Sequence, residues 1–482
     1  MKSPIFLSAA TLFFLLGAGT NYASADKADD AVHRIEKLEQ ELKTIRGQLE
    51  PLNNAGYSSI VGGRKARARR ARVLIDSEYT YAMLDPTSAG KSKPLYLLRA
   101  KGDGRIESPA IYLGTSLIAM ADYQQSNTAD DFGYLMRQPG SNHVGKTASE
   151  IVIHSAQFQI TANITPWISS YAEILYDPQQ SFGAGSITAL SRNQLQLRRA
   201  YVLLGNTQET PFYALIGKID SPFGQLNTLN PFTLSTDWHS FSGLSYGALL
   251  GYADDRLNLS VAAVQGGAQF RGLNAPIDGT NTPSRVNNYV ADASYKIPLG
   301  DKGKTILFGA SYEAGSSFCQ SFPITHFASC PRANPAFALY GALDLGELNV
   351  KGGYSQTIHS VPGTFNPNPP LNAYGAHGIS SFDIGAKYKV SSFGNPLDIS
   401  VDFSSLIAGP VGSPWRRQDQ WVAGLALYPT STIKVFAETV LVEGYLPLNF
   451  LTGGDPSLPA GETESSSHKK SSVFLFGIAL AI

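Results

Sequence analysis

The chain has 482 residues and no formal net charge, and charged side chains make up only 16% of it. Aromatic residues contribute 11%, and there are 46 glycines. The neutral balance argues against nucleic acid as a general partner. No apolar run of about 18 residues follows the N-terminus, which argues against membrane-spanning helices. Low charge with many aromatic residues and glycines is typical instead of a membrane β-barrel.

The first 25 residues have the pattern of a secretory signal. Lys2 precedes an apolar run at residues 5–16, and Ala23-Ser24-Ala25 forms the expected cleavage pattern. Export to an oxidising compartment predicts a local disulfide between Cys319 and Cys330, the alternative being two free thiols.

Residues 26–51 predict a periplasmic coiled-coil helix, which Pro51 ends. Its apolar seam repeats in steps of three and four and contains Ile35, Leu38, Leu42, Ile45 and Leu49. A helix this short is marginal alone, so we expect self-association, most simply as a homotrimer. A single amphipathic helix lying against the barrel or the membrane face is the alternative.

Residues 52–71 predict a linker that ends in a basic run. The run precedes the first expected strand, which favours contact with anionic lipid headgroups. A solvated hinge is the simpler interpretation, and nucleic acid is a distant third.

From residue 72 to residue 482, expected strands are joined alternately by short and long connections, the arrangement of short periplasmic turns and long external loops. We count about 18 strands, including weakly patterned ones at residues 72–82 and 95–100; merging or dropping that pair gives 16. The predicted fold class is all-β: a transmembrane antiparallel β-barrel of 16–18 strands with a short N-terminal coiled-coil helix.

The last stretch, residues 473–482, alternates between a bulky face that includes Phe474, Phe476 and Ile478 and a face of smaller side chains. An open strand this apolar would aggregate in water, but it suits the lipid-facing wall of a closed barrel. The stretch resembles the C-terminal signal that the assembly machinery of outer-membrane barrels reads, although it ends in Ile482 where such signals often end in Phe. A core strand of a soluble β-domain is the alternative.

In the barrel interpretation, the polar strand faces line an aqueous lumen. Charges of both signs are expected there, which would create a transverse field that tunes which solutes pass. They could also merely keep the lumen wet, and they do not support strict anion selectivity. The pore-lining candidates are Arg198, Lys218, Asp292, Lys296, Glu313, Lys351, Asp383, Lys387, Asp398, Asp402, Lys434 and Glu438.

Arg198 and Arg199 are adjacent on one expected strand, so regular alternation would point one of them outward. A charge that faces midplane lipid costs roughly 2–4 kcal/mol. Either a bulge turns both inward, or the outward arginine lies in a subunit interface. We favour the interface, because it agrees with the coiled-coil seam.

Several short motifs resemble the siderophore-porin family typified by the legiobactin receptor. They are Leu197-Arg198-Arg199-Ala200-Tyr201-Val202, Gly205-Asn206, Pro211-Phe212-Tyr213, Gly217-Lys218, Ser221-Pro222-Phe223-Gly224 and the Ile164-Thr165-Pro166-Trp167 turn. The signal–heptad–barrel layout is also similar, and more distantly it resembles the phosphate-selective trimeric porins. The resemblance implies uptake of a ferric siderophore in the outer membrane of a Gram-negative bacterium, and it carries over no ligand residues.

Siderophore receptors with 22-stranded barrels hold a plug domain in the lumen. The stretch before the first expected strand is too short for such a plug, so we expect a lumen without one and suspect residues 221–230 of folding into the pore. No nucleophile–base or metal-ligand spacing is found, so we predict neither an enzyme nor a cofactor. A general or weakly selective diffusion porin and a structural or adhesive barrel are the alternatives. The expected partners are a small-molecule solute, outer-membrane lipid and the assembly machinery.

Overall fold

The computed structural model describes residue 40 and residues 71–137, 145–176, 195–265, 286–300, 303–318, 333–360, 369–392, 394–446 and 461–482. The chain divides into two units, Met1–Arg70 and Ala71–Ile482. In the first unit only Gln40 is described, and it is helical and exposed. No described helix is long and apolar enough to cross a membrane.

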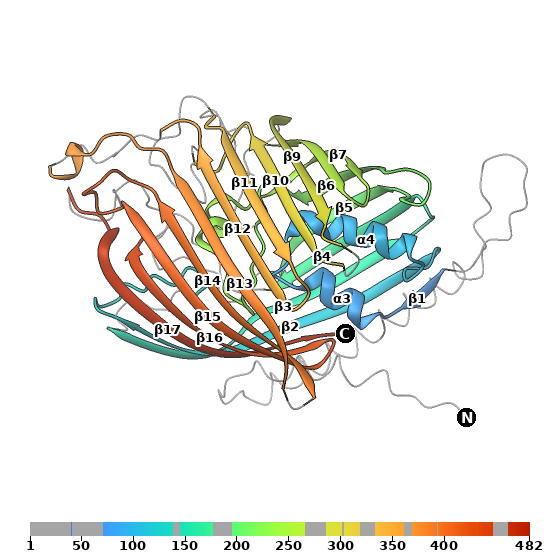
Figure 1. Cartoon of the computed structure of the whole chain (residues 1–482), viewed down its shortest axis with the longest axis horizontal. Helices are drawn as coiled ribbons and strands as arrows, with labels where there is room; N and C mark the ends of the chain where they lie inside the picture. The colour runs from blue at the N-terminus through green and yellow to red at the C-terminus, as the bar shows by residue number, and fades with distance from the viewer. Residues whose placement is uncertain are drawn as a thin grey trace, which may run out of the picture. The chain divides into compact units, whose positions relative to one another are not determined.

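Sixteen antiparallel strands, β2 to β17, form one closed barrel (Figure 1). Each strand pairs with the next in sequence, and the ring closes where Phe476 of β17 pairs with Ala121 of β2. The predicted antiparallel barrel is therefore confirmed, at the lower end of the expected strand number. The strands are β2 (Ala110–Ser126), β3 (Thr147–Asn163), β4 (Ile168–Tyr176), β5 (Leu195–Gly205), β6 (Phe212–Asp220), β7 (Leu244–Ala253), β8 (Leu257–Gln265), β9 (Val286–Pro298), β10 (Thr305–Glu313), β11 (Ala336–Asp344), β12 (Leu348–Thr357), β13 (Ser380–Ser392), β14 (Asn395–Ile407), β15 (Arg417–Thr430), β16 (Ile433–Tyr445) and β17 (Ser466–Ala481).

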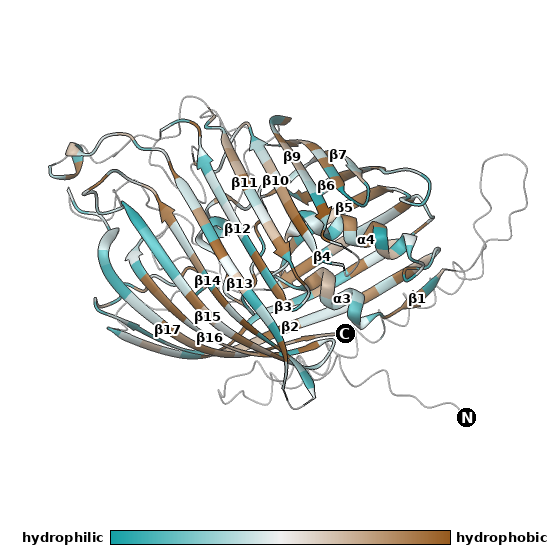
Figure 2. Ribbon diagram, viewed as in Figure 1, coloured by the Kyte–Doolittle hydropathy of each residue, from teal (hydrophilic) through white to brown (hydrophobic). Residues whose placement is uncertain are grey.

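The strand faces follow the period of two that the sequence shows. On β14, Ile399 and Val401 are 44% and 49% exposed, whereas Ser400 between them and Asp402 after them are buried. Figure 2 shows brown, apolar segments alternating with pale and teal ones along the strands. Apolar side chains outside and polar ones inside reverse the pattern of a water-soluble protein, and they suit a wall surrounded by lipid.

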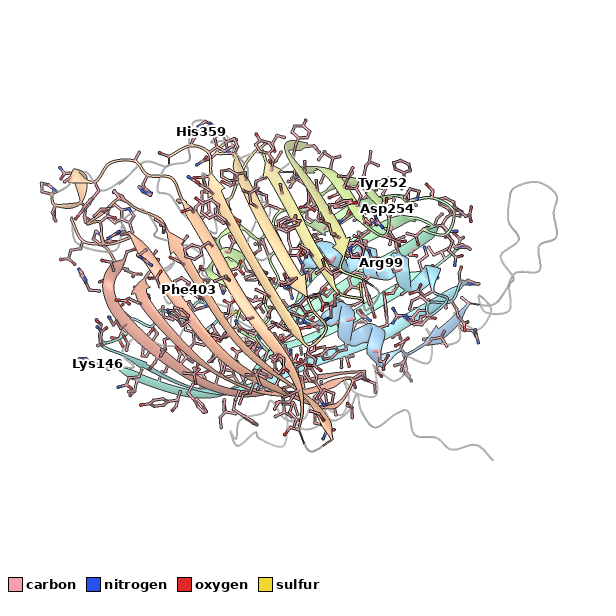
Figure 3. All side chains as sticks on the ribbon, in the orientation of Figure 1. Arg99, Lys146, Tyr252, Asp254, His359 and Phe403 are labelled. Carbon is pink, nitrogen blue, oxygen red and sulfur yellow. The ribbon has the colours of Figure 1, made fainter. Side chains whose placement is uncertain are left out.

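Short and long connections alternate around the ring, as predicted. Residues 164–167, 254–256 and 345–347 form short turns at one end, where Tyr252 and Asp254 are labelled in Figure 3. Lys146 precedes β3 and His359 follows β12. Both lie at the other end of the barrel, where the longer connections are. The two ends of the barrel therefore differ in the length of chain that covers them.

The expectation of strands at residues 72–82 and 95–100 is wrong except for the three residues of β1 (Arg72–Leu74), which pair in parallel with the start of β2. The other residues form α3 (Ser77–Leu84), η1 (Gly90–Ser92) and α4 (Lys93–Gly102). Asp76 caps α3 by accepting a hydrogen bond from the Tyr79 amide at 2.9 Å. Pro94 lies in the first turn of α4, where its missing amide hydrogen is tolerated.

Part of the inner wall is also apolar, although the sequence predicted a bulky apolar face only on the outer wall. Val473 and Leu475, from the smaller face of β17, are buried in a cluster with Phe232 and Phe436. The rings of Phe232 and Phe436 stack with their centroids 5.4 Å apart. Since Phe232 belongs to the connection between β6 and β7, this cluster packs a loop against the inside of the wall.

Candidate transport lumen

Residues 221–243, here called the crossing loop, run through the barrel interior and contain α5 (Thr236–Phe241). The Gly224 amide donates to the Ser311 hydroxyl of β10 at 2.9 Å. The Thr236 amide donates to the Ser404 hydroxyl of β14 at 3.1 Å. These contacts reach inward-facing side chains of two different strands, so the suspicion that residues 221–230 fold into the pore agrees with the structure.

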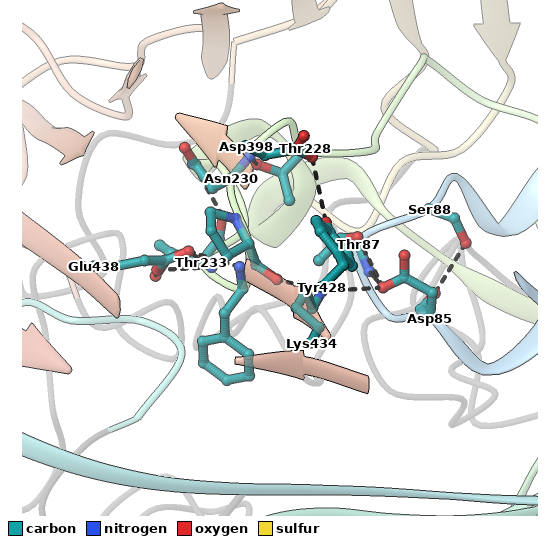
Figure 4. Close-up of polar contacts among 12 residues, drawn as sticks. Asp85, Thr87, Ser88, Thr228, Asn230, Thr233, Asp398, Tyr428, Lys434 and Glu438 are labelled. Atoms are coloured by element: carbon teal, nitrogen blue, oxygen red, sulfur yellow. Dashed lines mark hydrogen bonds and ion pairs between the residues drawn. The ribbon is translucent and has the colours of Figure 1, made fainter. Parts of the chain in front are cut away.

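Glu438 of β16 anchors the middle of the crossing loop. Its carboxylate accepts hydrogen bonds from the Phe232 amide at 2.6 Å and the Thr233 amide at 3.0 Å, and also from the Thr233 hydroxyl. Lys434 on the same strand donates to the Pro231 carbonyl oxygen at 2.7 Å (Figure 4). Hydrogen bonds to a buried carboxylate are about twice as strong as neutral ones, so this strand holds the loop firmly.

A second segment, residues 75–109, also occupies the lumen; we call it the N-terminal segment. The Tyr79 hydroxyl lies 3.0 Å from the Thr161 hydroxyl of β3, and Gln159 Nε2 of β3 donates to Thr80 Oγ1 at 3.1 Å. On another part of the wall, Lys91 forms an ion pair with Asp292 of β9 at 2.8 Å. The short helices of this segment therefore occupy part of the lumen, which the sequence did not predict.

The two segments meet inside the barrel. The Thr228 amide of the crossing loop donates to the Thr87 carbonyl oxygen of the N-terminal segment at 3.0 Å (Figure 4). Asp85, just before Thr87, lies 3.9 Å from Lys434, the residue that also holds the crossing loop. One wall lysine thus connects both segments.

Arg199 of β5 centres a buried charge network. It donates to Glu173 of β4 at 2.9 Å and to Asp220 of β6 at 2.5 and 2.7 Å. Lys93 of α4 is buried beside this network. Burial and the nearby Arg199 guanidinium lower the pKa of Lys93 to about 7.

Arg198 also turns inward, so the interface interpretation of an outward arginine is wrong. The register shifts between β4 and β5 at Glu173 and Ile174, which pair with Arg199 and Leu197 and leave Arg198 as an extra residue. This bulge places the Arg198 guanidinium 3.5 Å from Glu173, with the side chain 18% exposed. The alternative explanation, a bulge that puts both arginines inside, is the one that the structure supports.

Most of the other pore-lining candidates lie on inward faces, and several are paired. Lys351 and Asp383 are both buried and lie 2.5 Å apart, and Lys387 lies 3.1 Å from Asp398. Asp402 is buried near Asp383. Glu313 is fully buried at the end of β10, and Lys296 is half-buried on the inward-facing set of β9.

Lys218 is the exception among these candidates, because it lies with the outward-facing residues of β6. Its ammonium donates to the Leu197 carbonyl oxygen at 2.8 Å and lies 5.6 Å from the centre of the Tyr246 ring. Leu197 and Tyr246 are 45% and 44% exposed on the outer face. We therefore correct its placement: Lys218 does not line the lumen.

The sequence analysis missed several lumen residues. Arg137, at the end of the described part of the β2–β3 connection, is buried and forms ion pairs with Asp122 at 3.4 Å and with Glu150. Lys91 and Lys93 were missed because they lie between the strands expected at residues 72–82 and 95–100, where a connection between wall strands was expected. The Ser92-Lys93-Pro94 sequence is a helix-start signal that could have revealed α4.

Several sequence expectations lie outside the described residues. They are the signal segment at residues 1–25, the Cys319–Cys330 disulfide and the coiled-coil seam of Ile35, Leu38, Leu42, Ile45 and Leu49. The linker with its basic run also lies outside them, apart from Ala71.

No protein-family model matches the chain. A curated protein of Coxiella burnetii named "UPF0422 protein" is 24% identical over 273 residues, which are 55% of this chain and 53% of that protein. The chain thus spans about half the length of this relative. Among solved structures, the anion-selective porin of Comamonas acidovorans is 10% identical and has a TM-score of 0.47, covering 77% of this chain and 99% of that one. OprB of Pseudomonas putida is 10% identical with a TM-score of 0.46, covering 82% of this chain and 97% of that one.

Proposed function

We propose that the protein is a substrate-specific porin of the outer membrane that admits a ferric siderophore or a similar small chelate. An apolar outer wall and a polar inner wall are what a solute channel through lipid requires. The motifs shared with the siderophore-porin family supply the class of solute. Outer-membrane lipid and the assembly machinery that reads residues 473–482 are the expected partners.

One observation favours a substrate-specific porin over a general diffusion porin: two segments meet inside the barrel. The Thr228 amide of one donates to the Thr87 carbonyl oxygen of the other at 3.0 Å. A general diffusion pore keeps an open aqueous path. Here a solute must pass the crossing loop and the N-terminal segment, so passage depends on contacts that favour one kind of solute. The route is a porin route, without the large plug domain of the 22-stranded receptors.

Proteoliposomes test this proposal directly. Vesicles that contain the protein should take up iron(III) citrate, or a related carboxylate chelate, faster than a neutral sugar of similar size. Equal uptake of both solutes would support a general diffusion porin instead. Uptake of neither would leave a structural or adhesive barrel, the third function considered. Vesicles with a 16-stranded general porin serve as the control for leakage and for insertion.

A further inference from the structure

Lys91 of the N-terminal segment occupies a site that the barrel wall builds for an ammonium group. Its Nζ donates to Asp292 Oδ1 at 2.8 Å and to the Tyr340 hydroxyl at 3.0 Å. The ammonium also lies 4.3 Å from the centre of the Tyr340 ring. A carboxylate, a hydroxyl and an aromatic face together form the usual surroundings of a bound alkylammonium.

The site is held in shape from outside the N-terminal segment. The Tyr340 and Ser311 hydroxyls donate to Asp292 Oδ1 at 2.7 and 2.6 Å. Ser311 in turn accepts the Gly224 amide of the crossing loop at 2.9 Å. The carboxylate therefore keeps its orientation when Lys91 leaves, because β9, β10, β11 and the crossing loop fix it.

The site has room for a further donor. Asp292 Oδ2 is buried and has no hydrogen-bond partner among the described residues. A cavity of about 20 Å³, lined by Lys91, Asp220 and Asp292 among others, lies beside it. This volume is enough for one water molecule. A buried carboxylate with an open acceptor is costly unless a donor reaches it, so the site can accept one more hydrogen-bond donor besides the Lys91 ammonium.

The N-terminal segment is tethered so that it can be displaced. Its C-terminal end runs directly into β2, while β1 before it pairs with β2 through only three residues. Its described wall contacts are the buried apolar side chains of its helices, a small number of hydrogen bonds and two ion pairs, Lys91 with Asp292 and Asp85 with Lys434. Loss of the Lys91 pair would remove the charged contact between this segment and β9.

We propose that the N-terminal segment is a displaceable plug, and that Lys91 holds it closed by occupying a site that a primary ammonium group of the solute takes when the plug moves. This inference rests on the proposed function, and it adds that, among the chelates admitted, those that carry a primary amine are favoured. Lys91 acts as a built-in substitute for that amine.

Butylammonium binding tests the site without requiring transport. In Lys91→Ala both the ammonium and most of its stem are absent, which leaves space for the butyl chain, so titration calorimetry in detergent should show binding at least about tenfold tighter than in the wild type, where Lys91 competes. Asp292→Asn in the same background should remove that gain. Lys101→Ala is the matched control, because Lys101 of α4 donates, among the described residues, only to the Gly205 carbonyl oxygen, at 3.4 Å, and its loss should leave binding at the wild-type level.

A reversible cross-link tests displacement without removing any lumen contact. A Cβ atom on Gly102 would lie 3.1 Å from Thr207 Oγ1. Because Oγ1 is one bond from Cβ, the two Cβ atoms lie within about 4.5 Å, the range of a disulfide. Gly102→Cys with Thr207→Cys, in a background of Cys319→Ser and Cys330→Ser, should close the channel in planar bilayers when oxidised and restore its opening when reduced.

The outcomes separate this inference from the proposed function. Tighter butylammonium binding in Lys91→Ala, together with reductant-dependent opening of the cross-linked variant, would support it even if iron chelates are not taken up. Unchanged binding in Lys91→Ala would overturn the ammonium site. Equal channel opening of the oxidised and reduced cross-linked variant would overturn the displaceable plug.

Discussion

Arg199 neutralises two carboxylates at once, and its side chain is only 5% exposed. Removing it leaves the buried Glu173 and the partly buried Asp220 as anions with too little compensating charge. We expect Arg199→Met to lower the free energy of unfolding by about 3–5 kcal/mol, measured by urea unfolding in detergent or lipid. Arg198→Met is the control: its guanidinium lies 3.5 Å from Glu173 and is more exposed, so a smaller loss is expected. Equal losses would contradict a special role for Arg199.

Lys93 gives a pH dependence whose sign can be worked out. Its pKa is about 7 in the folded protein, against an ordinary value of 10.5, because burial and Arg199 disfavour the charged form. Between these values the unfolded chain binds more protons than the folded one, so stability should rise with pH by up to about 1.4 kcal/mol per unit. Below pH 7 the contribution of Lys93 to stability does not change with pH. Lys93→Met should remove the rise, and urea midpoints at pH 7 and 10 measure the difference; an identical pH profile in both proteins would refute the assignment.

At the residue scale, the sequence showed which positions carry charge, but it did not show which way the side chains of Arg198 and Lys218 point. The bulge that turns both Arg198 and Arg199 inward depends on the register with β4, which a single strand does not encode. Lys218 was misplaced for a related reason, since the lone alternation of β6 does not show which face is inside. By contrast, the clean alternation around Asp398 and Asp402 was sufficient to predict the inward face of β14.

At the scale of elements, the crossing loop depends on a single acidic anchor. Glu438→Ala would leave the buried Phe232 and Thr233 amides without their acceptor, a loss of about 1–3 kcal/mol for each unsatisfied group. We expect the loop to leave the wall, with more frequent channel opening in planar bilayers. Glu443→Ala is the matched control, because Glu443 lies on the same strand but pairs with Lys470 in an exposed position at 2.9 Å. Similar opening in both variants would argue against the anchor.

The terminal strand makes a second element-scale prediction. Phe476 is 54% exposed on the outer face of β17, the strand that closes the ring by pairing with β2. An arginine there would face lipid and should lower the free energy of unfolding by roughly 2–4 kcal/mol. Heat-modifiable electrophoresis and urea unfolding measure the effect. His468→Arg, at the exposed start of the same strand, should change stability little, and a comparable loss there would contradict the lipid-facing assignment.

Strands in which polar and apolar residues alternate with a strict period of two were predictable from the sequence. The helices in the lumen were not. Residues 77–84 include two tyrosines and a threonine, which favour strands when the sequence is considered alone. Enclosure by the barrel wall overrides that preference, because a helix satisfies its own backbone hydrogen bonds where no neighbouring strand is available. The same cause explains why the sequence count of 18 strands was too high.

At the scale of the whole molecule, self-association through residues 26–51 stays a prediction, now without the support of an outward arginine. Leu38→Asp with Leu42→Asp would bury charge in the seam and should shift the detergent-extracted protein towards monomers in unheated native electrophoresis. Deletion of residues 26–51 should do the same, while the barrel still inserts. A wild-type protein that already migrates as a monomer would contradict the coiled coil.

The central claim is that the lumen admits a particular chelate through a path that the two segments otherwise close. Single-channel recording of the wild-type protein in planar bilayers, with and without iron(III) citrate, tests it most directly. The account predicts a mostly closed channel with brief openings, whose frequency and current change when the chelate is added. A large, steady current that is indifferent to the chelate would contradict it.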